Sequence, residues 1–138
     1  MTKTKILRAF LQKVWNEKQY DTIPLFLEEQ YTINLDTGDL WEGKKLNFSE
    51  FKKRLDFSFN SFPDMCFDIK TAIEDGNHVA ITWVMTGTNT GIIGGFPPTN
   101  KKIKANGFTI YHFNNDKICG HTQVFDRAII MRQLGFIK

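Results

Sequence analysis

The second half of the chain contains four segments with the composition of β-strands, and their succession limits the possible folds more than any other feature. The segments read "MCFDIKTAIE", "HVAITWVMTGTNT", "KIKANGFTIYHF" and "KICGHTQVF", all rich in β-branched and aromatic residues. Asp75-Gly76 and Asn114-Asn115-Asp116 are typical of tight turns between consecutive antiparallel strands. The sequence therefore predicts an antiparallel sheet formed mainly by residues 65–125.

The first half of the chain has helical patterns. Apolar side chains in residues 4–18 recur with the spacing of an amphipathic helix. Asp21 can cap a second, short helix, which tolerates Pro24 in its first turn and continues through "LFLEEQ"; "YTINL" is then extended. Asn47 and Glu50 have the spacing of a capping box, which predicts the start of a third helix.

A C-terminal helix is expected in "DRAIIMRQLG", where Gly135 closes it. Helices that precede the strands, rather than alternate with them, indicate an α+β fold. One domain over residues 1–138 is expected, because this length suits a single core and no linker interrupts it. The 13 Phe residues suit a cavity lined by rings. We therefore expect a cone-shaped, curved antiparallel sheet with three N-terminal helices and a short C-terminal helix.

Composition and short motifs argue against several functions. The net charge is only +3 and the lysines are scattered, so nucleic-acid binding is not expected. Cys66 and Cys119 are isolated, which excludes a Cys-x-x-Cys metal site. The sequence shows neither a signal-peptide pattern nor an apolar run of membrane-spanning length, so we expect a cytoplasmic protein that does not bind membranes.

The glycine-rich segment "GTNTGIIGGFPPTNKK", residues 87–102, is not a phosphate-binding loop. The P-loop motif requires a lysine directly after a glycine, whereas the lysines here follow Thr99-Asn100. The two prolines also exclude a helix at this point. We expect a long connection between two strands that hangs over the mouth of the cavity as a partial lid.

Four motifs in order give the chain a family resemblance. "FPDM", "EDGNHVAITWVMTGTNTG" followed by "GFPPTNKKI", "IYHFNNDKI" and "QVFDRAIIMRQLG" together resemble the SnoaL-like polyketide cyclases, within the nuclear-transport-factor-two-like superfamily. The resemblance covers nearly the whole chain. It implies a homodimer that uses neither metal nor other cofactor, and an intramolecular aldol condensation as the reaction.

Asp126 is the first catalytic candidate, because it matches the general acid/base aspartate of the family. A carboxylate in an apolar pocket can act as such a base, because burial raises its pKa. The alternative is a structural role, since Asp126 directly precedes a predicted helix and could be its N-cap. The sequence leaves both roles open.

His112 is the second catalytic candidate, and its position matches a histidine of the family's active site. Alternation along its strand places it on one face with Phe108 and Ile110. A structural role is the alternative here too. His121 has the opposite parity from Asp126 in the last strand, so we interpret it as structural.

The remaining pocket residues follow from the same parity and from the resemblance. If Asp126 faces the cavity, other residues of the same parity in its strand do so as well. Relatives often carry Glu at position 120, Trp at position 122 and His at position 89, so the wall is smaller and less polar here. The predicted substrate-contacting residues are Asn34, Asn89, Phe108, Ile110, Thr122 and Val124.

Two functions of different classes remain. The first is a cofactor-independent cyclase, or a related lyase or isomerase, that acts on a hydrophobic carbonyl-bearing small molecule. The second is a non-catalytic domain that holds a ligand or protein partner in the same cavity. Epoxide hydrolysis on this scaffold is a third possibility, and Thr82, where relatives often carry Arg, argues against it. In each case we expect a homodimer formed through the open face of the sheet.

Overall fold

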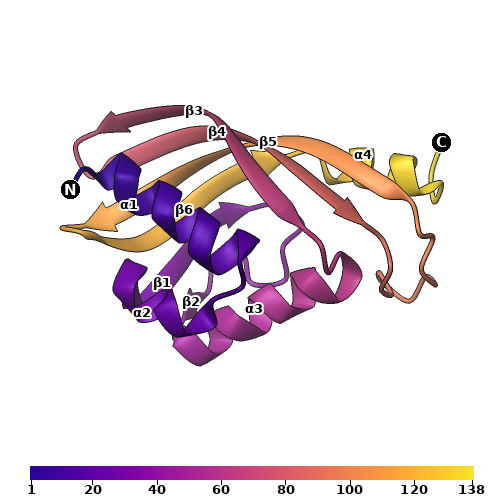
Figure 1. The fold of residues 1–138 in the computed structure, drawn as a ribbon, viewed down its shortest axis with the longest axis horizontal. Helices are drawn as coiled ribbons and strands as arrows, with labels where there is room; N and C mark the ends of the chain where they lie inside the picture. Colours follow the sequence, from indigo (N-terminus) through magenta and orange to yellow (C-terminus); the bar gives the residue numbers. More distant parts are fainter.

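The computed structural model describes residues 1–138 and consists of helices packed against a six-stranded sheet (Figure 1). The helices are α1 (Lys3–Phe10), the π-helical η1 (Leu11–Asn16), the 3-10 helix η2 (Tyr20–Thr22), α2 (Ile23–Phe26), α3 (Phe48–Ser61) and α4 (Arg127–Leu134). The strands are β1 (Leu27–Asp36), β2 (Lys45–Leu46), β3 (Cys66–Asp75), β4 (His78–Thr88), β5 (Lys102–Asn114) and β6 (Lys117–Phe125). The predicted α+β class is confirmed.

The sheet differs in one respect from the expected antiparallel arrangement. Its strand order is β2-β1-β6-β5-β4-β3, and β1 runs parallel to β6 while every other neighbouring pair is antiparallel. The sheet is therefore mixed, and it does not close on itself. Tight turns join β3 to β4 and β5 to β6, as the turn residues predicted, and the long loop of residues 89–101 joins β4 to β5.

The N-terminal helix changes its winding halfway along. Thr2 caps α1 by accepting a hydrogen bond from the Lys5 amide at 3.2 Å. The continuous helix expected over residues 4–18 is instead α-helical to Phe10 and π-helical beyond it. At its end, Asn16 exchanges two hydrogen bonds with the backbone of Phe67 on β3, at 2.8 and 2.9 Å. These contacts fix the wider final turn against the sheet.

The second helix is shorter than expected. α2 ends at Phe26, and the residues "LEEQ" that were predicted to continue it begin β1 instead. Leu27 is buried and pairs with Ile118, while Tyr31 and Ile33 are buried on the same side. Burial against β6 therefore outweighs the helix preference of the two glutamates, a preference worth only tenths of a kcal/mol per residue.

The third helix begins where the capping box predicted. The Asn47 side chain accepts from the Glu50 amide at 2.8 Å, and the Glu50 carboxylate accepts from the Asn47 amide at 3.0 Å. Phe51, Leu55 and Phe59 form the buried face of α3 and are spaced four residues apart. This face and the N-terminal helix cover one side of the sheet (Figure 1).

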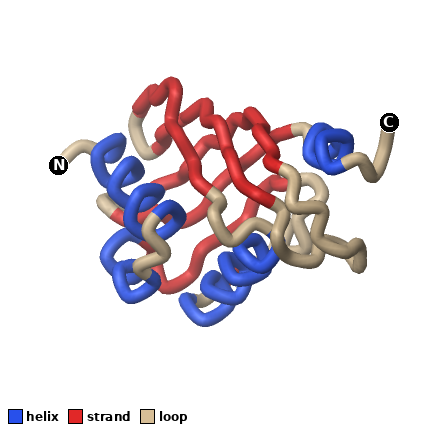
Figure 2. Tube along the Cα trace, turned by 45° about the vertical axis from the view of Figure 1, so that its right-hand side comes forward, coloured by secondary structure: helices blue, strands red, loops and turns tan.

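The fourth helix and the loop of residues 89–101 lie together at the other end of the molecule (Figure 2). Asp126 caps α4, and Gly135 ends it in the left-handed conformation, with φ 85°. Phe96 of the loop stacks on Phe136 beyond the helix, with ring centroids 4.3 Å apart. None of the helices is both long and apolar enough to cross a membrane.

Candidate functional site

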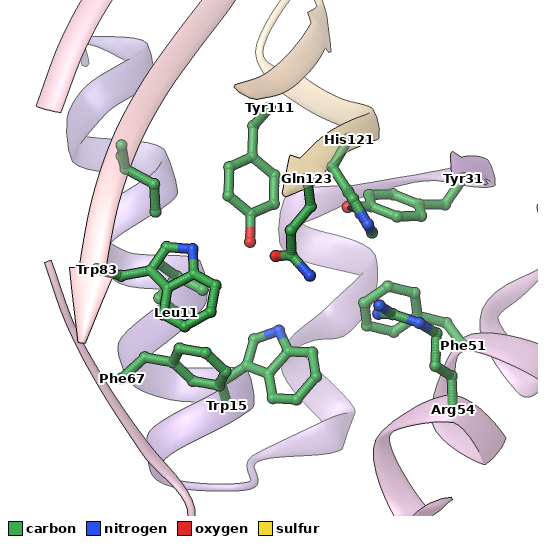
Figure 3. Close-up of a pocket in the computed structure, with 11 residues that line it drawn as sticks. Leu11, Trp15, Tyr31, Phe51, Arg54, Phe67, Trp83, Tyr111, His121 and Gln123 are labelled. Atoms are coloured by element: carbon green, nitrogen blue, oxygen red, sulfur yellow. Dashed lines mark hydrogen bonds between the residues drawn. The ribbon is translucent and has the colours of Figure 1, made fainter. Parts of the chain in front are cut away.

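The helices and the covered face of the sheet enclose a hollow with two adjoining parts. The inner recess has a volume of about 40 Å³, and the outer chamber, toward α4 and the loop, has about 300 Å³. Both parts are lined by Trp15, Arg54, Phe67, Trp83 and Gln123. The recess is shown in Figure 3, and its size suits one water molecule or one carbonyl group.

Strand register decides which side chains reach this hollow. Residues paired across neighbouring strands point to the same face, and Val79, Tyr111 and His121 form one such row. The next row toward the mouth contains Ile81, Thr109 and Gln123. All but Gln123, which is half-buried, are buried beneath the helices. The inward face of β6 therefore carries His121 and Gln123.

An irregularity in β1 brings one carboxylate into the same site. Between Ile33 and Leu35 the pairing with β6 shifts register, so that Asp36 lies opposite Gln123. A β-bulge of this kind changes the face to which the following residues point. As a result, both Ile33 and Asp36 are buried while Leu35 is exposed.

Asp36 is the centre of a buried polar network. Its Oδ2 accepts from His121 Nε2 at 2.9 Å, Gln123 Nε2 at 3.1 Å and Arg54 Nη2 at 3.1 Å. Its Oδ1 accepts from Arg127 Nη2 at 2.8 Å. Burial alone would raise the pKa of Asp36, but the His121 hydrogen bond and the charges of the two arginines outweigh it and lower that pKa. Asp36 is therefore an ionised, fully occupied acceptor.

His121 links Asp36 to a buried tyrosine. Its Nδ1 lies 2.6 Å from the Tyr31 hydroxyl, while its Nε2 faces Asp36. Burial lowers the pKa of His121 despite the opposing effect of Asp36, so the ring is neutral near pH 7. Burial, reinforced by Tyr111, raises the pKa of Tyr31. The tautomer that satisfies every contact has the proton on Nε2, with Tyr31 donating to Nδ1.

Tyr111 supplies the one uncommitted hydroxyl of the inner recess. Gln123 Oε1 accepts from Thr109, which in turn accepts from the Trp83 indole, each at 2.8 Å. The Tyr111 ring is buried and its hydroxyl points into the recess beside Gln123 (Figure 3), yet it forms no hydrogen bond within the chain. Burial raises the pKa of Tyr111, so the hydroxyl keeps its proton and can donate it to a ligand.

The outer chamber is mainly apolar. Its walls come from α3, β4, the end of β6, α4 and the loop, and include Phe57, Phe62, Met65, Met85, Ile92, Ile93, Phe125, Ile130 and Met131. Its charged groups compensate one another: Arg54 contacts Asp36 and Asp39 at 3.1 and 3.0 Å, and Arg127 contacts Asp36 at 2.8 Å. Two arginines against two aspartates leave no net charge, which favours an uncharged, hydrophobic ligand.

The arrangement combines a hydrogen-bond donor with an acid–base chain. A carbonyl oxygen in the recess can accept from Tyr111, and the Tyr31–His121–Asp36 chain can take up or deliver a proton. No group of three or more His, Cys, Asp or Glu side chains is placed to hold a metal ion. The polar groups of the cavity are thus suited to proton transfer at a bound organic molecule.

The two catalytic residues predicted from the sequence lie outside this cavity and far from each other. Asp126 is exposed and caps α4, accepting from the Ala128 amide at 3.0 Å. His112 lies on the outer face of the sheet, opposite Gly120 in the register. Gly120 and Asp126 are six positions apart along the chain, which in an extended strand is a distance of roughly 20 Å. The structure does not bring the pair into one site.

The predicted pocket residues on the strands also lie on the outer face, so their expected place in the cavity is wrong. Phe108 and Val124 are 45% and 62% exposed. Ile110 pairs with Thr122 on the same face, and Asn34 borders a separate hollow on that side. The prediction rested on the premise that Asp126 faces the cavity, whereas Asp126 is exposed at the helix cap and the β6 residues of the same parity lie outside the cavity as well.

Asn89 is buried, but in the loop rather than in the cavity wall. Its side chain donates to the Ser61 and Gly91 carbonyls at 3.2 and 2.8 Å and accepts from both the amide and the hydroxyl of Thr99 at 3.0 Å. All its hydrogen-bonding capacity therefore holds the loop against the end of α3. Ile92 and Ile93 border the outer chamber, so the loop forms part of its wall.

The sequence analysis missed the residues that do form the polar site. They are Tyr31, Asp36, Arg54, Tyr111, His121 and Gln123. A usable signal lay in β4, where Val79, Ile81, Trp83 and Met85 alternate with smaller or polar residues. Carried across the hairpins, that parity selects Tyr111, His121 and Gln123. No comparable signal marks Asp36, whose direction depends on the bulge.

Comparison with known proteins agrees with this architecture. The family model described as "SnoaL-like polyketide cyclase" matches residues 5–134. A candidate polyketide cyclase from Acidithiobacillus ferrooxidans is 37% identical, with a TM-score of 0.91 over 99% of this chain and 96% of that one. Among curated proteins, none matches the sequence significantly.

Two more distant structures share the fold. A SnoaL-like polyketide cyclase from Agrobacterium tumefaciens is 23% identical, with a TM-score of 0.81 over 98% of this chain and 99% of that one. IdmH, a candidate polyketide cyclase from Streptomyces antibioticus, is 20% identical, with a TM-score of 0.84 and the same coverage. The family match extends over nearly all of the chain, so this protein belongs to the SnoaL-like polyketide cyclase family.

Proposed function

We propose that the protein is a cofactor-independent cyclase, or a related lyase or isomerase, that acts on an uncharged hydrophobic molecule with a reactive carbonyl group. The observation that carries the proposal is the Tyr31–His121–Asp36 chain at the closed end of an apolar cavity, with the Tyr111 hydroxyl beside it. The family membership supports the same reaction class.

In the proposed reaction, the substrate enters through the outer chamber with its carbonyl group leading. The carbonyl oxygen accepts a hydrogen bond from Tyr111, which stabilises the negative charge that forms when the adjacent carbon loses its proton. That proton goes to the oxygen of Tyr31 while the Tyr31 proton moves to Nδ1 of His121. The resulting imidazolium is stabilised by Asp36, 2.9 Å from Nε2.

Ring closure then requires no further reagent. The enolate carbon attacks a second carbonyl of the same molecule, forming a carbon–carbon bond, and the new alkoxide takes back the proton held by the Tyr31–His121 pair. Atoms and charges balance, because the proton removed from carbon ends on oxygen. The apolar walls exclude water, which would otherwise protonate the enolate first.

The alternative is a non-catalytic binding domain, and one observation favours it. Asp39 in the cavity wall and Asp36 behind it are both held by arginines, so no unpaired carboxylate is present to act as a base. On this alternative the polar network only orients a ligand. The two functions differ in whether the protein accelerates exchange of the α-protons of a bound ketone with solvent.

The test uses hydrogen–deuterium exchange at carbon, which needs no knowledge of the natural substrate. A panel of hydrophobic aryl ketones is incubated with the protein in D₂O, and loss of the α-proton signal is followed by NMR. Binding is measured separately by quenching of Trp15 and Trp83, which line the cavity. The proposal expects saturable, accelerated exchange. Binding without acceleration across the panel would overturn it in favour of the binding domain.

A further inference from the structure

Two histidines face each other on the opposite side of the sheet from the cavity. His78 at the start of β4 is paired directly with His112 near the end of β5. Their Nδ1 atoms are 3.0 Å apart and their rings are nearly perpendicular, at 89°. They border an open hollow of about 500 Å³ together with Thr32, Asn34, Cys119 and Thr122.

One of the two imidazoles is held in the state that a metal ion requires. His112 Nε2 lies 2.9 Å from the Thr122 hydroxyl, which can accept the Nε2 proton and leave the lone pair on Nδ1. His78 is exposed, and its ring can turn to present its own Nδ1 lone pair.

The identity of the two side chains indicates a class of metal ion. The 3.0 Å between the Nδ1 atoms is a hydrogen-bond distance, and a turn of the exposed His78 ring lets both lone pairs reach one ion with metal–nitrogen bonds of about 2.0–2.1 Å. Imidazole nitrogens bind late first-row ions, and affinity along that series rises through Ni²⁺ to a maximum at Cu²⁺.

We propose that His78 and His112 form a bidentate site for a late first-row transition ion, preferentially Ni²⁺ or Cu²⁺, with water in the remaining positions. The ion takes the place of the proton shared between the two Nδ1 atoms, and that proton moves to Nε2 of His78. The site lies outside the cavity and is independent of the proposed reaction.

The test is a calorimetric titration of untagged, EDTA-treated protein with Ni²⁺ at pH 7.5, with Mg²⁺ as the ion that should not bind. We expect one Ni²⁺ per chain, loss of that saturable heat in His78→Gln and His112→Gln, and unchanged binding in the control Asn77→Ala, an exposed neighbour. Melting curves of the same variants check that each is folded.

A second measurement keeps the proposal testable if other groups also bind the ion. Saturating Ni²⁺ should raise the melting temperature of the wild type, because an ion that binds only the folded state stabilises it. Neither histidine variant should show this rise. Equal binding and an equal rise in His78→Gln would overturn the proposal, as would the absence of saturable binding in the wild type.

Discussion

At the residue scale, the site depends on one carboxylate more than on any other group. Asp36 accepts four side-chain hydrogen bonds, from His121, Gln123, Arg54 and Arg127. Removing the negative charge would weaken all four of these bonds, and the two arginines among the donors would keep Asp39 as their only carboxylate partner. The role of Asp36 is to position and neutralise the groups around it, rather than to contact the substrate.

Replacing Asp36 with Asn should therefore be costly. The substitution keeps the size of the side chain but removes the charge from a buried ion-paired group, a change that typically costs about 3–5 kcal/mol. Chemical denaturation would measure the loss. The matched control is Asp126→Asn, which should cost less than about 0.5 kcal/mol, because Asn caps a helix about as well as Asp. Equal effects of the two substitutions would contradict this role for Asp36.

Tyr111→Phe tests the donor in the recess without disturbing the fold. Its hydroxyl has no partner within the chain, so the free energy of unfolding should change by less than about 0.5 kcal/mol. In the exchange assay, loss of an oxyanion donor should lower the rate by about 10²–10³-fold. A variant that is stable and fully active would exclude Tyr111 from the proposed mechanism.

The histidines also predict how stability depends on pH. The pKa of His121 in the folded protein lies below the ordinary value of 6.5, so below about pH 6.5 the unfolded chain binds the additional proton. The free energy of unfolding should then fall as the pH drops from 7 toward 5. His112 contributes in the same direction, since its pKa is also lowered.

Denaturation at several pH values would measure this dependence. His112→Gln isolates the buried histidine, because it removes the contribution of the outer face, and a clear slope between pH 7 and pH 5 should remain. A flat profile in that variant would mean that His121 is not held neutral. The carboxylate of Asp36 adds a further loss only at lower pH, as its own lowered pKa is reached.

At the scale of elements, much of the fold could be predicted and the site could not. Capping residues, turn residues and β-rich segments predicted α3, α4 and the four strands from β3 to β6, because these signals act over a few neighbouring residues. The extent of α2 was wrong, because pairing of Leu27 with Ile118 decides it. The inward direction of Asp36 depends on a bulge that no local pattern marks.

The side chain of Asn89 holds the loop of residues 89–101 in place. The prediction for this element is that removing that side chain loosens the loop. Asn89→Ala leaves the Thr99 amide and the Ser61 and Gly91 carbonyls without their side-chain partner. We expect a loss of about 1–3 kcal/mol and faster amide exchange at Thr99. Thr90→Ala, at an exposed neighbour, is the control and should change neither. Unaltered exchange in the Asn89 variant would mean that other contacts hold the loop.

At the scale of the whole molecule, the outer face of the sheet is the open surface. Helices cover the inner face, whereas Ile73, Phe108 and Val124 are exposed on the outer one, at 63%, 45% and 62%. An exposed apolar group of this kind on a curved sheet favours self-association. The homodimer expected from the sequence therefore stays a prediction, with these side chains at the proposed interface.

Light scattering would test the dimer directly. The wild type should have twice the mass of one chain, and Val124→Lys should shift it toward a monomer, because a buried lysine without a partner opposes association. Leu25→Lys, an exposed site on α2, is the control and should remain dimeric. If the wild type is monomeric at all concentrations, the predicted homodimer is contradicted.

The parallel pairing of β1 with β6 has a consequence for how the protein reaches its folded state. Tyr31 and Asp36 meet His121 and Gln123 only after nearly the whole chain has been made, since their hydrogen bonds join residues 85 to 90 positions apart. The hairpins from β3 to β6 involve much closer neighbours and can form earlier. On the ribosome, the chain should therefore pair β3, β4 and β5 before β6 joins β1, so the polar site assembles only in the last step of sheet formation.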